Sequence, residues 1–249
     1  MNGESECLGG GVEFGRTVHI PIRENGDSLT ADWMMPSHAR GIVLFAHGSG
    51  SGRNSSRNRA VARYLVGRCM GTFLLDLLTP AEEHIDERTR HLRFDIPLLA
   101  GRLVEATRWI HSQPEAKGLP LGYFGASTGA GAALVAAAEL HDTIAAVVSR
   151  GGRPDLAGSA LHHVMAPTLL LVGGNDEIVE ELNRKALLRL HCPKHLTMIP
   201  GATHLFEEHG ALEQVAMFAA DWFLKYFAED SLNQSSVQSP RGGERRYAL

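Results

Sequence analysis

Short apolar runs alternate with longer amphipathic stretches along most of the chain. Runs rich in Val, Ile, Leu and Phe predict buried strands at residues 41–48, 71–78, 121–125, 144–152, 168–174 and 195–201. Stretches with helical periodicity follow most of these runs, at residues 55–69, 94–111, 128–140, 177–191 and 211–227. This alternation is typical of an α/β protein whose mostly parallel sheet carries helices on both faces.

The two ends of the chain depart from this rhythm. Residues 14–22 and 28–35 read as two strands joined by "ENGD", and an Asn-Gly pair favours a hairpin, so we expect the sheet to begin antiparallel. About eight strands result, with no repeat and no second core, which predicts one domain over residues 1–228. Residues 229–249 are polar and Ser-rich, and we expect this tail to be disordered.

One internal segment is strongly charged. "TPAEEHIDERTRHLR" at residues 79–93 follows a predicted strand directly. It fits a solvated helix, and it also fits a flap over the ends of the strands. The sequence leaves both readings open.

Composition narrows the partners. The net charge of -4 and the scattered Lys and Arg residues argue against nucleic acid. The first residues lack the features of a signal peptide and no apolar run approaches the length of a membrane span, so we expect a cytoplasmic protein without membrane contact. Three scattered cysteines are too few for a disulfide framework or a zinc cluster, which agrees with a reducing compartment.

A glycine-flanked serine lies at the junction of a predicted strand and helix. In "GYFGASTGAG", Gly125, Ser127 and Gly129 match the pattern G-x-S-x-G. A sharp turn at such a junction holds a serine hydroxyl exposed, and the start of the helix directs backbone N–H groups towards negative charge. The pattern is short enough to arise by chance, so Ser127 also fits a plain turn residue. The functional interpretation makes Ser127 a nucleophile.

A serine nucleophile needs a general base and an orienting carboxylate. Asp176 and His204 follow the last two predicted strands, at the sheet edge where doubly wound proteins carry their functional residues. Their order after Ser127 is the one expected for a catalytic triad on such a sheet. Asp176 also fits a helix N-cap, His204 a loop histidine, and Glu177 is the alternative acid.

An oxyanion formed during acyl transfer needs two backbone donors. The N–H of Thr128, next to the serine, is one candidate. The glycine-rich loop "HGSGSG" after an earlier strand offers a second, the N–H of Ser49. This loop matches neither common phosphate-binding pattern, which argues against a nucleotide site.

Several stretches together resemble the dienelactone hydrolase-like group of α/β-hydrolases over about residues 14–227. They are "HGSGSGRNSSRNR", "LLDLLTPAEE", "GYFGASTGAGAAL", "VVSRGGRPDL", "VGGNDEIV" and "PGATHLFEE". The resemblance implies an α/β-hydrolase fold with an eight-stranded sheet, no cofactor or metal, and hydrolysis through a covalent intermediate. Dienelactone hydrolase proper uses a cysteine nucleophile, whereas this chain has Ser127. No long insertion is present that would form a separate cap domain.

The sequence therefore predicts a serine esterase acting on small or short-acyl esters. Hydrolysis of lactones, dienelactones or amides, acyl transfer, and a binding module with an idle triad remain alternatives, as does assembly into a homo-oligomer. Arg150 and Arg153, in "SRGGRP" at a strand end, are candidates to contact an anionic group of the substrate. The competing interpretation pairs them with the acidic residues of segment 79–93.

Overall fold

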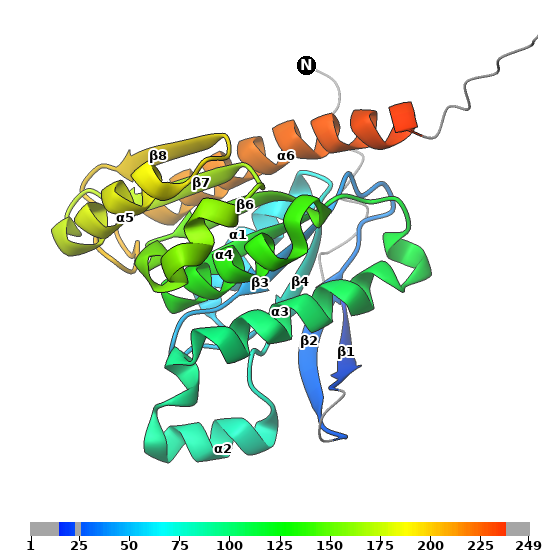
Figure 1. Cartoon of the computed structure of the whole chain (residues 1–249), viewed down its shortest axis with the longest axis horizontal. Coiled ribbons are helices and arrows are strands. Elements are labelled where there is room, and N and C mark those ends of the chain that lie inside the picture. The colour runs from blue at the N-terminus through cyan, green and yellow to red at the C-terminus, as the bar shows by residue number, and fades with distance from the viewer. Residues whose placement is uncertain (1–14, 23–25, 238–249) are drawn as a thin grey trace, which may run out of the picture.

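A twisted eight-stranded sheet forms the centre of the protein (Figure 1). The computed structural model describes residues 15–22 and 26–237. The strand order is β1-β2-β4-β3-β5-β6-β7-β8, with β1 and β2 antiparallel and the strands from β4 onward parallel. The strands are β1 (Arg16–Pro21), β2 (Ser28–Met34), β3 (Ile42–Ala46), β4 (Gly71–Leu75), β5 (Leu121–Ala126), β6 (Ile144–Arg150), β7 (Thr168–Gly173) and β8 (Lys194–Ile199). The predicted α/β fold and the antiparallel beginning of the sheet are confirmed.

Helices cover both faces of the sheet because side chains of the strands alternate between two apolar cores. In β3, Val43 and Phe45 face one core, whereas Ile42 and Leu44 face the other. The first core contains α1 (Ser56–Gly67) and α6 (Ala211–Val237), and the second contains α3 (Ile96–His111), α4 (Thr128–Leu140) and α5 (Glu177–Arg189). The strands are buried on both sides, which explains their continuous apolar runs.

The charged segment forms a helix with little cover. α2 (Pro80–Thr89) begins at Thr79, whose side chain accepts a hydrogen bond from the N–H of Glu82 while the Glu82 carboxylate accepts one from the N–H of Thr79. In Figure 1, α2 projects from the body of the molecule below α3. Buried Arg102 of α3 holds it through a 2.7 Å contact with Glu82. α2 is therefore largely solvated, although part of it also lines a pocket described below.

Three details differ from the expectations. α6 runs to Val237 rather than to residue 227, so the predicted tail is helical up to that point, and residues 238–249 lie outside the described part. A 3-10 segment, η4 (Pro154–His163), follows β6 and was not predicted. Cys69 is disulfide-bonded, contrary to the expectation of unpaired cysteines, whereas Cys192 is free and buried.

No helix within residues 15–22 and 26–237 combines the length and the apolarity that crossing a bilayer requires.

Candidate functional site

Ser127 lies in the tight turn between β5 and α4. Its backbone has φ 50° and ψ -123°, a conformation that costs a non-glycine residue about 1–3 kcal/mol. The glycines around it are required by space: a Cβ at Gly129 would lie 2.3 Å from the carbonyl oxygen of Ala46, and one at Gly125 would lie 2.4 Å from Cα of Ala130. The G-x-S-x-G pattern is therefore a steric requirement of this strained turn.

Backbone hydrogen bonds fix this turn to the end of β6. The N–H of Ser127 donates to the carbonyl of Arg150 at 3.3 Å, and the N–H of Arg153 donates to the carbonyl of Ser127 at 3.0 Å. Ser127 itself is half-buried. Within the described residues its Oγ makes no hydrogen bond, so the hydroxyl is available to a further group.

Asp176 and His204 are brought together by the loops after β7 and β8. Oδ2 of Asp176 lies 2.7 Å from Nδ1 of His204. The N–H of Asn175 donates to the carbonyl of Ala202 at 2.9 Å, which ties the two loops together. Asp176 is the N-cap residue of α5, but its side chain makes no capping hydrogen bond. Its carboxylate instead binds the His204 imidazole. Exposed Glu177 starts the helix.

The same imidazole packs against the end of β6. A Cβ added at Gly151 would lie 3.7 Å from Cε1 of His204. Gly151 directly follows Arg150, whose carbonyl accepts the N–H of Ser127. The three residues predicted from strand ends thus converge on one edge of the sheet. No hydrogen bond between Ser127 Oγ and the His204 ring is formed among the described residues.

The glycine-rich loop after β3 passes next to the serine. A Cβ at Gly48 would lie 3.0 Å from Cβ of Ser127, and the N–H of Ser49 donates to Oγ1 of Thr128 at 2.9 Å. Ser49 and Thr128, the two residues predicted to donate to the oxyanion, are therefore in direct contact through the Thr128 side chain. In this conformation the N–H of Ser49 is occupied by the Thr128 hydroxyl rather than open to the pocket.

His47 holds this loop in place and was missed by the sequence reasoning. Its Nε2 accepts a hydrogen bond from the N–H of Leu77 at 3.0 Å, so Nδ1 carries the proton and donates to the carbonyl of Gly48 at 3.0 Å. Burial lowers the pKa of His47, and the Gly48 carbonyl and the charge of Asp76 oppose this in part. The signal in the sequence was its position, directly after a buried strand and before the glycines.

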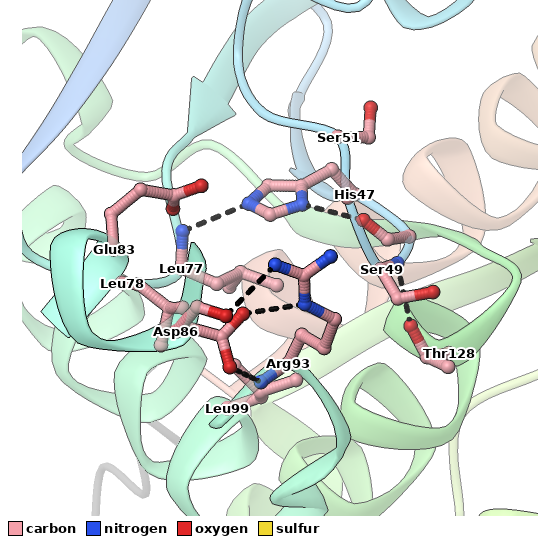
Figure 2. Close-up of a pocket in the computed structure, with 12 residues that line it drawn as sticks. His47, Ser49, Ser51, Leu77, Leu78, Glu83, Asp86, Arg93, Leu99 and Thr128 are labelled. Carbon is pink, nitrogen blue, oxygen red and sulfur yellow. Dashed lines mark hydrogen bonds and ion pairs between the residues drawn. The ribbon is translucent and has the colours of Figure 1, made fainter. Parts of the chain in front are cut away.

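A pocket opens beside Thr128, between this loop and α2 (Figure 2). The Arg93 guanidinium points towards the loop, and a Cβ at Gly50 would lie 3.4 Å from its Nη1. The Asp86 carboxylate binds the Arg93 guanidinium and fixes its position. Burial by itself would raise the pKa of Asp86, but the hydrogen bonds and the charge of Arg93 outweigh burial and lower this pKa. Burial and the nearby charge of Asp76 raise the pKa of Glu83, which also lines the pocket.

The two arginines of the "SRGGRP" stretch have different surroundings. Arg153 forms a bidentate pair with Asp155, with both N–O distances 2.8 Å. Arg150 is buried, and none of the described residues accepts a hydrogen bond from its Nε or Nη1. Neither pairs with segment 79–93, whose Glu82 and Asp86 are bound by other arginines. The competing interpretation of these two arginines was therefore wrong.

No group of three or more His, Cys, Asp or Glu side chains within the part of the chain that the structure describes is arranged to hold a metal ion.

The strand order, the helices on both faces and the strained turn after β5 define an α/β-hydrolase fold without a separate cap among the described residues. Residues 97–228 match the model of the dienelactone hydrolase family, and the chain belongs to this family.

The chain is also similar to three further proteins. A dienelactone hydrolase from Anabaena variabilis ATCC 29413 superposes with a TM-score of 0.82 at 58% identity, over 85% of this chain and 97% of its own. Est1E from Butyrivibrio proteoclasticus has a TM-score of 0.70 at 17% identity, over 85% of this chain and 99% of its own, and shares the fold. A Mycobacterium tuberculosis (strain H37Rv) protein named as a phosphoribosyl transferase is 59% identical over 192 residues, which are 77% of this chain and 42% of that protein. The chain thus spans about two fifths of the length of the curated relatives it matches.

Proposed function

We propose that this protein is a serine hydrolase that cleaves carboxylic esters through an acyl-enzyme intermediate. The observation that carries the proposal is the 2.7 Å contact between Asp176 and His204 at the sheet edge where Ser127 occupies a strained turn. A nucleophile, a base and an orienting acid on adjacent loops are the parts that ester hydrolysis requires. The family and its esterase-like fold agree with a hydrolase.

In the proposed reaction, Ser127 Oγ attacks the ester carbonyl carbon while Nε2 of His204 takes the hydroxyl proton. The tetrahedral intermediate collapses, and His204 returns the proton to the leaving alcohol. Water then attacks the acyl-enzyme and gives a proton to His204, which passes it to Ser127 Oγ as the carboxylic acid is released. Asp176 holds the imidazole with Nδ1 protonated and stabilises its charged form. Hydrogen bonds between serine and base are often long before substrate binds.

The backbone N–H groups of Thr128 and Ser49 are proposed to bind the oxyanion. Thr128 begins α4, where the first N–H groups lack partners within the helix. Ser49 first has to give up its bond to the Thr128 hydroxyl, which a more negative oxyanion favours, because hydrogen bonds to charged acceptors are stronger.

Lactone hydrolysis is the second candidate, since a lactone is a cyclic ester and the Anabaena variabilis relative is named a dienelactone hydrolase. The transferase name belongs to a relative more than twice as long as the matched region, and we do not extend it to this chain. A small-molecule ester as substrate, a cytoplasmic location and the oligomeric state stay predictions.

The test uses a fluorophosphonate probe, p-nitrophenyl acetate, a lactone series and an anilide on the purified chain. Labelling at Ser127, and loss of both labelling and hydrolysis in Ser127→Ala, are expected. A folded protein with no turnover of any activated ester and no labelling would mean an idle site. Preference for the lactones over p-nitrophenyl acetate would support the second candidate.

A further inference from the structure

Arg150 is a buried guanidinium without an acceptor. It is the last residue of β6 and only 7% of it is exposed. Its Nε and Nη1 are buried, and the described residues provide no hydrogen-bond partner for either. An unpaired buried charge costs several kcal/mol, so proteins rarely keep one without a function.

The groups around Arg150 do not neutralise it. The aromatic ring of Phe206 lies 6.0 Å from the guanidinium carbon of Arg150 and offers weak compensation for its charge. Burial, with a smaller contribution from the like charge of Arg57, lowers the pKa of Arg150 to about 10. At neutral pH the side chain is still charged, and a second arginine reinforces the positive potential.

Arg57 comes from the first turn of α1 and is itself incompletely satisfied. Its Nη1 contacts Glu207 at 3.0 Å, while its buried Nε finds no acceptor in the part of the chain that the structure describes. Glu207 follows His204 in the loop after β8 and is 65% exposed, so this ion pair is weak and open to exchange. Two cationic side chains with free donors therefore lie beneath the loop that carries the proposed base.

The main chain at Arg150 adjoins the residues proposed to react. The carbonyl of Arg150 accepts the N–H of Ser127, and the next residue, Gly151, contacts the His204 ring. By contrast, Arg153 is neutralised by Asp155, and Arg93 by Asp86. Unlike Arg93 and Arg153, Arg150 therefore has N–H donors that no described carboxylate binds, at the sheet edge that carries the site.

We propose that Arg150, assisted by Arg57, binds an anionic group, either a carboxylate or a phosphate monoester, of the ester that is cleaved at Ser127. The assignment of the anion to a substrate rests on the proposed function. Guanidinium groups bind both anions through paired N–H donors, and a partly desolvated site strengthens such bonds.

The first experiment measures anion binding without catalysis. Isothermal titration of succinate and of inorganic phosphate into Ser127→Ala is compared with the double variants that add Arg150→Met, Arg150→Lys or Arg153→Met. We expect one of the two anions to bind, and Arg150→Met to weaken it at least about tenfold, as expected for loss of a charged hydrogen bond. Arg150→Lys should weaken it less, and Arg153→Met should change it by no more than about twofold. Equal binding with and without Arg150, or no binding of either anion at millimolar concentration, would overturn the proposal.

A kinetic experiment then links the anion to the ester. The ratio of kcat/KM for mono-p-nitrophenyl succinate to that for p-nitrophenyl acetate is expected to fall about tenfold or more in Arg150→Met, if succinate is the anion bound. An unchanged ratio would remove Arg150 from substrate recognition. If the unmodified protein hydrolyses no ester, the proposed function fails, while the titrations still decide whether Arg150 binds anions.

Thermal unfolding separates a binding role from a structural one. Removal of an uncompensated buried charge should raise the unfolding midpoint of Arg150→Met in anion-free buffer, and the stabilising effect of the bound anion should disappear in this variant. A lower midpoint together with an unchanged anion effect would make Arg150 a structural residue.

Discussion

Oδ2 of Asp176 lies 2.7 Å from Nδ1 of His204, although 28 residues separate them in the chain. The side chain of Asp176 is 14% exposed and that of His204 39%, so the pair has a shielded acid and a more accessible base. This orientation leaves Nε2 of His204 free to accept a proton. The pair therefore has the polarity that a serine nucleophile needs.

Asp176→Asn should lower kcat/KM for an activated ester by a factor of about 10³–10⁴, because an amide stabilises neither the correct tautomer nor the charged imidazole. Hydrolysis of p-nitrophenyl acetate measures this. Glu177→Gln is the matched control, since this neighbouring carboxylate is exposed at the start of α5. A greater loss in Glu177→Gln than in Asp176→Asn would assign the acid to Glu177.

Ser127→Gly should stabilise the protein while abolishing hydrolysis. Glycine adopts φ 50° without the steric strain that serine has there, so the free energy of unfolding should rise by about 1 kcal/mol and the melting midpoint by about 2–4 °C. Ser127→Ala, which keeps the strain, should lose the activity without this gain. The strain argument fails if calorimetry shows Ser127→Gly to be no more stable than Ser127→Ala.

Gly129→Ala should disrupt the turn. The added methyl group would lie 2.3 Å from the carbonyl oxygen of Ala46 and 2.4 Å from that of His47, and backbone atoms cannot move aside cheaply. We expect a loss of about 1–3 kcal/mol or more in urea unfolding, together with lost activity. Gly101→Ala, in α3 with nothing within 4 Å, should instead stabilise by about 0.5–1 kcal/mol. Equal effects of the two substitutions would contradict this assignment.

His47 should make the stability sensitive to mild acid. Burial holds the pKa of His47 in the folded protein below its ordinary value. As the pH falls below about 6.5, His47 therefore becomes protonated in the unfolded chain before it does so in the folded protein. The unfolded state then binds more protons, and the free energy of unfolding decreases, by at most about 1.4 kcal/mol per pH unit.

Urea unfolding at pH 7.5 and 5.5 tests the role of His47. His47→Gln, whose side-chain oxygen can still accept the N–H of Leu77, should reduce the difference between the two pH values. His19→Gln, at an exposed position in β1, serves as the control and should leave the difference in place. An undiminished difference in His47→Gln would show that another group is responsible.

Much of the fold could be predicted because its strands are buried on both faces and therefore appear as continuous apolar runs. The end of α6 could not be predicted. The residues after Phe227 are polar and lack an amphipathic pattern, but a helix that has already formed can extend through such residues. The sequence also could not decide whether α2 contributes to a pocket. A charged helix on the surface has the same pattern whether or not it lies beside a site.

The sequence by itself determined the alternation of strands and helices, the glycine-flanked turn at Ser127, and the strand ends that carry Asp176 and His204. These follow from local periodicity and from the steric needs of a tight turn, which nearby residues control. Only the tertiary structure decided that the Asp176 carboxylate contacts His204 instead of capping its helix, that His47 anchors the glycine-rich loop, and that Arg153 is paired while Arg150 is not. Such pairings depend on how the loops of separate strands pass over one sheet edge, and no local pattern contains that path.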